Sequence, residues 1–164
     1  MLALYGHPFS SYTWKALIAL YANGTEFEFR EIDQSVPKYE SFTGMAHPSG
    51  QFPVLTDGDT VVVETSAIVE YLAVHYPGPA PLIPTDPAEA VVARMIDRVF
   101  DHYVMGNVQR VMATYFVNNA DRLGVLYVIW FKQIWLPGNG WQPYTHGNGE
   151  PNSDHTNHVH LSVR

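Results

Sequence analysis

Two adjacent serines, Ser10 and Ser11, stand between a short apolar run and a segment with helical spacing. A hydroxyl at the start of a helix can cap the backbone N–H groups, or it can donate a hydrogen bond to a bound anion. The residues alone leave both roles open, capping and hydrogen bonding to a bound anion.

A second group of polar residues, Glu64, Thr65 and Ser66, follows a β-branched run and precedes another helical pattern. An acid and two hydroxyls at the start of a helix suit a zwitterionic amino-acid ligand, because donors there take a carboxylate and the acid takes an ammonium. The alternative is that Thr65 or Ser66 only caps the helix and that Glu64 is solvated. Nearby, Pro53 has no N–H and belongs at the start or edge of a strand, which leaves the backbone of Phe52 open to a cleft.

Three histidines, His155, His158 and His160, lie close together near the end of the chain. Side chains two residues apart share one face of a strand, so His158 and His160 are spaced as two metal ligands, or as a ligand and a base. Cysteine is absent, which excludes a disulfide framework, a thiolate nucleophile and a cysteine zinc site.

The elements that must position these residues alternate along the first half of the chain. The predicted order is β-α-β, a loop with a short helix over residues 34–50, β-β-α and then one long helix, which is an α/β fold with a mixed four-stranded sheet. The predicted strands span 2–5, 27–32, 54–56 and 60–63, and the predicted helices run from Ser10 or Ser11 to Ala22, from Thr65 or Ser66 through Leu72, and over 86–117.

Composition narrows the classes of function. Hydrophobic residues make up 46% of the 164 residues, and 9 basic against 16 acidic side chains give a net charge of −7. A packed core is therefore expected, whereas binding to nucleic acid or to an anionic membrane is not. The N-terminus lacks the pattern of a secretion signal and no 18-residue apolar run is present, so we expect a cytoplasmic protein without a membrane partner. Composition changes abruptly near Asn118.

Residues 1–117 resemble the N-terminal, thioredoxin-like domain and first helix of the helical domain of a bacterial glutathione S-transferase. The stretches that carry this resemblance are LYGHPFSSYTWKALIAL, GQFPVLTDGDTVVVETSAIVEYL and PLIPTDP. The resemblance implies a cis Pro53, a hydrogen bond from Phe52 to the cysteinyl backbone of glutathione, and a γ-glutamyl group held by Glu64 and Thr65 with Ser66 adjacent. It places Gln51 at the glycyl end.

The same resemblance points to the reaction. The pattern SSYTW is similar to the SSCSW of zeta-type transferases, which implies Ser10 as the catalytic serine, with Ser11 as its competitor and Tyr12 as a weaker candidate. The implied function is activation of glutathione, as co-substrate, for conjugation to a small electrophile. Members of this family usually dimerise, so a homodimer is expected as well. A non-catalytic thioredoxin-like binding module is the alternative.

The last segment, 118–164, resembles the end of an actinobacterial or phage cell-wall peptidase that uses zinc. LGVLYVIW and DHTNHVHLSV carry this resemblance, which implies His160 as a zinc ligand assisted by His158 and His155. A peptidoglycan peptidase with zinc is the second alternative, although the other ligands of that family come from an upstream segment that this chain lacks. The expected division is a glutathione-binding domain over 1–76, a linker over 77–86, the first helix of a truncated helical domain over 87–117, and an unrelated irregular or β tail. The chain would then be chimeric.

Overall fold

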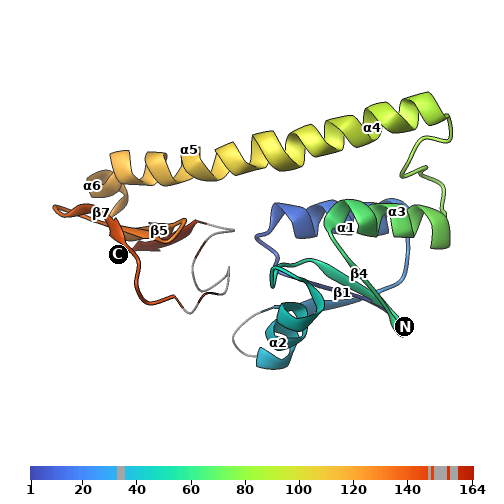
Figure 1. The fold of residues 1–164 in the computed structure, drawn as a ribbon, viewed down its shortest axis with the longest axis horizontal. Helices are drawn as coiled ribbons and strands as arrows, with labels where there is room; N and C mark the ends of the chain where they lie inside the picture. Colours follow the sequence, from blue (N-terminus) through green and yellow to red (C-terminus); the bar gives the residue numbers. More distant parts are fainter. Residues whose placement is uncertain (33–35, 148, 150–154, 156–158) are drawn as a thin grey trace. The chain divides into compact units, whose positions relative to one another are not determined.

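The computed structural model describes residues 1–32, 36–147, 149, 155 and 159–164. The chain forms two compact units, Met1–Met95 and Ile96–Arg164, and Figure 1 shows the elements of each. None of the helices in the described residues is both long and apolar enough to span a membrane.

The first unit is built on a mixed four-stranded sheet, as the sequence predicts. Its elements are β1 (Leu2–Gly6), α1 (Ser11–Ala22), β2 (Glu28–Glu31), α2 (Pro37–Ala46), β3 (Val54–Asp57), β4 (Thr60–Val63), α3 (Thr65–His75) and most of α4 (Pro87–Val99). The strand order is β2-β1-β3-β4; β1 pairs in parallel with β2 and antiparallel with β3, and β3 and β4 form a hairpin. This is the thioredoxin-like arrangement with a β-α-β half and a β-β-α half.

Alternation along the central strands divides the core of this unit into two layers. Leu2 and Leu4 of β1 pack with Leu55 in one cluster, which also takes the buried residues of α1 and α3. Ala3 and Tyr5 point the other way, into a cluster that includes aromatic side chains of α2. Helices α1 and α3 therefore cover one face of the sheet and α2 covers the other (Figure 1).

The β3–β4 hairpin is tied to the end of α3 through Asp57. The Asp57 carboxylate accepts hydrogen bonds from the hydroxyl of Tyr76, at 2.5 Å, and from that of Tyr71, at 3.1 Å. These bonds, that of Tyr76 first, hold the pKa of Asp57 below its usual value, and the carboxylate raises the pKa of Tyr76 to about 12. The last turn of α3 is thereby fixed to the hairpin that leads into its first turn.

The helical run expected over 86–117 is present, with a wider turn inside it. Helix α4 continues into the π-helical turn η1 (Phe100–Val104) and then into α5 (Met105–Asn118). Within this turn the Met105 N–H donates to the Phe100 carbonyl, five residues back. The apolar side chains along one face of this run are exposed: Val91, Val92, Met95, Ile96, Val99, Phe100 and Tyr103.

The second unit packs an antiparallel sheet against the end of this helical run. After α6 (Ala120–Leu123) come β5 (Val125–Trp130), β6 (Gln133–Leu136), β7 (Gly140–Pro143) and β8 (His160–Val163), in the order β7-β6-β5-β8. Val125 and Val128 of β5 are buried with Ala113 of α5, and Trp130 and Trp135 pack on the same cluster. The expected irregular or β tail is thus a sheet with a small core of its own.

Candidate functional site

The first predicted site residue, Ser10, is the N-cap of α1. Its hydroxyl oxygen accepts a hydrogen bond from the Thr13 N–H at 3.3 Å, so the capping role is confirmed. Accepting that bond leaves the hydroxyl hydrogen to donate, so capping and donation to a ligand are compatible. Ser11 is the first helical residue and is exposed, and it makes no cap contact.

The Phe52–Pro53 segment lies beside the loop that precedes α1. The Phe52–Pro53 peptide bond is cis, and Pro53 is buried directly before β3. The ring of Phe52 lies 6.3 Å from that of His7, between the centroids, and Gln51 and Phe52 are half-buried. The position of Pro53 before a strand is what the sequence predicts.

The start of α3 is joined to the start of α1 by two side-chain hydrogen bonds. The buried Thr65 hydroxyl donates to the Tyr12 carbonyl at 3.4 Å, and the Lys15 ammonium donates to the Ser66 hydroxyl at 3.3 Å. The segments that carry Ser10, Phe52 and Glu64 therefore converge in the fold. Because its hydroxyl hydrogen is used on Tyr12, Thr65 offers its backbone N–H as a donor.

Glu64 is the N-cap residue of α3, yet its side chain does not cap the helix. The first hydrogen bond of the helix runs from the Ile68 N–H to the Glu64 carbonyl at 2.9 Å, so the N–H groups before Ile68 point out of the helix end. Glu64 has φ 70° and ψ 120°, a backbone region that a residue with a Cβ rarely adopts. Such strain persists only where the surroundings fix it, and it is concentrated at functional sites.

The Glu64 carboxylate contacts His47 instead. Its Oε1 lies 3.3 Å from the Nε2 of His47, whose side chain is 6% exposed while that of Glu64 is 70% exposed. An uncapped helix N-terminus beside an exposed carboxylate offers donors for an anion and an acceptor for a cation. The arrangement can bind a zwitterion, as an amino-acid end group is.

His47 and Lys15 are the residues of this site that sequence reasoning missed. His47 stands in a polar loop before Pro48, where a lone histidine carries no signal, and Lys15 lies on a helix as any solvated lysine does. Their partners Glu64 and Ser66 are far along the chain, so neither contact could be found by local spacing.

The predicted metal ligands of the tail lie in the second unit. The rings of His155 and His160 are 5.1 Å apart between centroids, and Tyr127 stacks on His160 at 5.7 Å. His158 lies outside the described residues. Within the part of the chain that the structure describes, no three His, Asp or Glu side chains are grouped as metal ligands.

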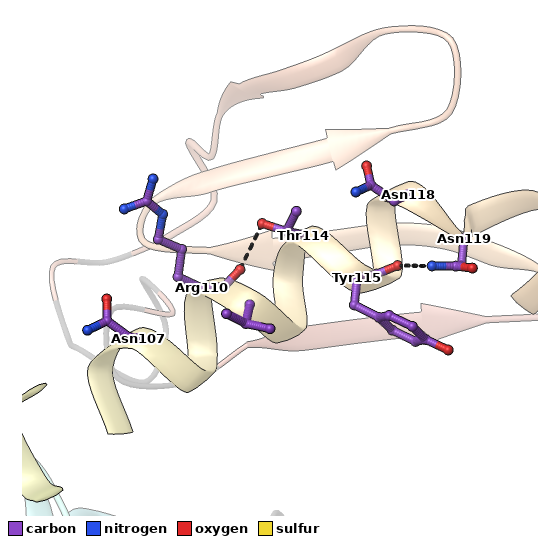
Figure 2. A pocket seen from close by; sticks show the side chains of 7 residues that line it. Asn107, Arg110, Thr114, Tyr115, Asn118 and Asn119 are labelled. Atoms are coloured by element: carbon purple, nitrogen blue, oxygen red, sulfur yellow. Dashed lines mark hydrogen bonds between the residues drawn. The ribbon is translucent and has the colours of Figure 1, made fainter. Parts of the chain in front are cut away.

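A hollow of about 440 Å³ lies along α5 (Figure 2). It is lined by Asn107, Arg110, Val111, Thr114, Tyr115, Asn118 and Asn119. These residues share one face of a single helix, and two of their polar side chains bond to carbonyls one turn back: Thr114 to Arg110 and Asn119 to Tyr115. Groups that are satisfied by their own helix do not converge on a ligand, so the hollow is not the candidate site.

Comparison with known proteins divides the chain in two. Residues 4–80 match the family of the glutathione S-transferase N-terminal domain. Residues 94–159 match a different family, the VldE C-terminal domain. The second family is unrelated to the zinc peptidases that the tail resembles, so the peptidase resemblance of 118–164 is not confirmed.

Among curated proteins, glutathione S-transferase 1 of Dianthus caryophyllus is 36% identical over 88 residues, which are 52% of this chain and 38% of that protein. A probable maleylacetoacetate isomerase of Caenorhabditis elegans is 31% identical over 93 residues, 57% of this chain and 43% of that protein. The chain thus spans about two fifths of the length of these relatives. Because the relatives include a plant and a nematode protein, the expected bacterial type is not confirmed.

Solved structures agree in fold. A glutathione transferase homolog from Burkholderia, with bound glutathione, has a TM-score of 0.54 at 26% identity, over 74% of this chain and 67% of that one. The beta-etherase LigF of Sphingobium has a TM-score of 0.55 at 30% identity, over 62% of this chain and 43% of that one. Family match, relatives and fold all make residues 4–80 similar to a glutathione S-transferase N-terminal domain.

Proposed function

We propose that the first unit binds glutathione at the start of α3 and activates its thiol beside Ser10. The observation that carries the proposal is the N-terminus of α3, uncapped by its own Glu64 and flanked by that exposed carboxylate. The γ-glutamyl carboxylate would take the N–H groups of the first turn, at Thr65 and Ser66, and the γ-glutamyl ammonium would take Glu64.

The remaining contacts follow from the convergence of the three segments. Phe52, directly before β3, would hydrogen-bond the cysteinyl backbone, and Gln51 would lie at the glycyl end. The sulfur then comes to the start of α1, where the Ser10 hydroxyl donates to it. That hydrogen bond and the dipole of α1 favour the thiolate at neutral pH. Two of the similar structures, from Burkholderia and Sulfitobacter, contain bound glutathione, which supports the choice of ligand.

The reaction proposed is conjugation. The thiolate forms a bond to an electrophilic carbon of a small molecule, and the leaving group departs with the electron pair of the bond that breaks. The relatives named as glutathione S-transferases support this chemistry. The chain spans about two fifths of the length of such relatives. A small electrophile as second substrate and a homodimer, both expected for the family, are therefore proposed as well.

Calorimetric titration of the full chain with glutathione tests the site. Glu64→Ala is expected to lower the affinity about tenfold, the worth of a hydrogen-bonded contact to a charged group. Glu26→Ala, at an exposed acid of the same unit, is the matched control and should leave affinity unchanged. Lack of glutathione binding by the unaltered chain, or equal affinities of the two variants, would overturn the proposal. A second assay measures conjugation of glutathione to an aryl halide, which a transferase catalyses and a non-catalytic binding module does not.

A further inference from the structure

The buried imidazole of His47 contacts Glu64 and has no place in the function proposed above. His47 is the C-cap of α2: its N–H donates to the Thr43 carbonyl at 3.0 Å, and its carbonyl accepts from the Gly50 N–H at 2.9 Å. The backbone of the residue is therefore fixed at both its donor and its acceptor. Its side chain is buried, where a polar ring needs partners for both nitrogens.

The hydrogen bonds of the ring determine which nitrogen carries hydrogen. Nδ1 accepts a hydrogen bond from the Ser49 N–H at 3.0 Å, so Nδ1 holds a lone pair in that direction and the hydrogen is on Nε2. Nε2 points at Oε1 of Glu64, 3.3 Å away. A backbone donor thus sets the tautomer, and the tautomer directs an N–H at the carboxylate.

Glu64 needs such a partner if it is to hold a cation in one place. Its carboxylate is 70% exposed and would otherwise move among the rotamers of a long side chain, whose loss of freedom opposes binding. With Oε1 on His47, Oε2 remains for a cation beside the N-terminus of α3. We propose that His47 is a positioning residue that orients Glu64 toward the γ-glutamyl ammonium; this rests on the function proposed above.

Two substitutions test the contacts of the two ring nitrogens of His47 separately. In His47→Asn the side-chain oxygen can still accept from the Ser49 N–H, but the side chain is too short to reach Glu64. In His47→Gln the longer amide can still donate to Glu64. Titration of the full chain is expected to show an affinity for glutathione about fivefold lower in His47→Asn and close to the original in His47→Gln.

A glutathione analogue distinguishes a positioning role of His47 from a purely structural one. Glutaryl-cysteinyl-glycine is glutathione without the γ-glutamyl amino group, so its binding does not use the Glu64–ammonium contact. His47→Asn should leave the affinity for this analogue unchanged while lowering that for glutathione. Equal losses for both ligands, or no loss for either, would overturn the role of His47. If the unaltered chain binds neither, the proposed function itself fails.

Histidine labelled with ¹⁵N gives a second measurement that does not depend on the stability of His47→Asn. The His47 Nε2 resonance is expected to shift in Glu64→Gln, and to shift when glutathione is added but not when the glutaryl analogue is added. A resonance unaffected by Glu64→Gln would show that the pair is not formed in solution, and would overturn the inference without bearing on whether glutathione binds.

Discussion

The Ser10 hydroxyl can accept one hydrogen bond and donate another at the same time. As the N-cap of α1 its oxygen accepts from the Thr13 N–H, and as a proposed thiolate donor it uses its hydrogen. Substitutions that separate the two capacities are available, because aspartate also caps helices well but its ionised side chain cannot donate a hydrogen bond.

We therefore expect Ser10→Ala and Ser10→Asp to differ in stability and to agree in function. Ser10→Ala should lower the free energy of unfolding by about 1 kcal/mol through loss of the cap, and Ser10→Asp should not. Both should reduce the thiolate absorbance of bound glutathione at neutral pH, with the thiol shifted toward its unperturbed pKa. Ser11→Ala is the control, since Ser11 is exposed and makes no cap contact. Thiolate absorbance retained in Ser10→Asp would remove Ser10 from the chemistry.

At this scale the sequence predicts the roles that depend on neighbours in the chain. The cap at Ser10 and the position of Pro53 before β3 follow from local pattern, and the structure contains both. The contact of His47 with Glu64 joins the end of α2 to the start of α3, and no spacing rule connects those positions. The unusual backbone of Glu64 also lies beyond prediction, because glutamate has no preference for positive φ.

Among the elements, the junction of β1 with α1 determines where the start of α1 lies relative to the sheet. Gly6 ends β1, and a Cβ built on it would come within 2.5 Å of Thr13 Cγ2. Thr13 is fully buried and its hydroxyl accepts from the His7 N–H at 3.3 Å. A glycine is required here because the first turn of α1 lies directly against the end of the strand.

Gly6→Ala is accordingly expected to lower the free energy of unfolding by about 1–3 kcal/mol, the usual cost of overpacking a core. Thr13→Ala removes the clashing atoms, so adding it to Gly6→Ala should cost less than the sum of the two single changes. Urea unfolding of the two single variants and the double variant measures this coupling. Additive losses would show that Gly6 and Thr13 are not in contact. Gly44→Ala is the control, because φ is not positive there and nothing lies near the added Cβ, and it should cost no stability.

Helices and strands could be predicted where the apolar residues follow one clear period. Pairing between strands that are far apart in the chain could not. The strands of the first sheet and helices α1 and α3 follow from alternation and helical spacing of apolar residues. The π-helical turn η1 within the long helix does not, because one extra residue per turn barely alters the apolar period. In the second unit β5 pairs with β8, across more than twenty intervening residues, and only tertiary packing selects that partner.

For the molecule as a whole, self-association depends on the exposed apolar residues of α4. Apolar residues at helical spacing are typical of a buried helix face, but these side chains are exposed. Exposed apolar patches of more than a few hundred Å² mark association surfaces in soluble proteins or lead to aggregation. We therefore expect the full chain to self-associate at micromolar concentration, consistent with the homodimer included in the proposed function.

The variant that tests this changes two neighbouring positions on α4, Val92→Lys with Ile96→Lys, which lie four residues apart on one face of the helix. Light scattering after size exclusion should show a lower mean mass for this variant than for the unaltered chain. Glu89→Lys, one turn before Val92 on the same side of the helix, replaces one exposed charged side chain by another, so it adds positive charge without removing apolar area and should leave the mass unchanged. An unaltered chain that elutes as a monomer at all concentrations would contradict the prediction. Equal reduction by both variants would mean that charge, rather than apolar contact on α4, controls association.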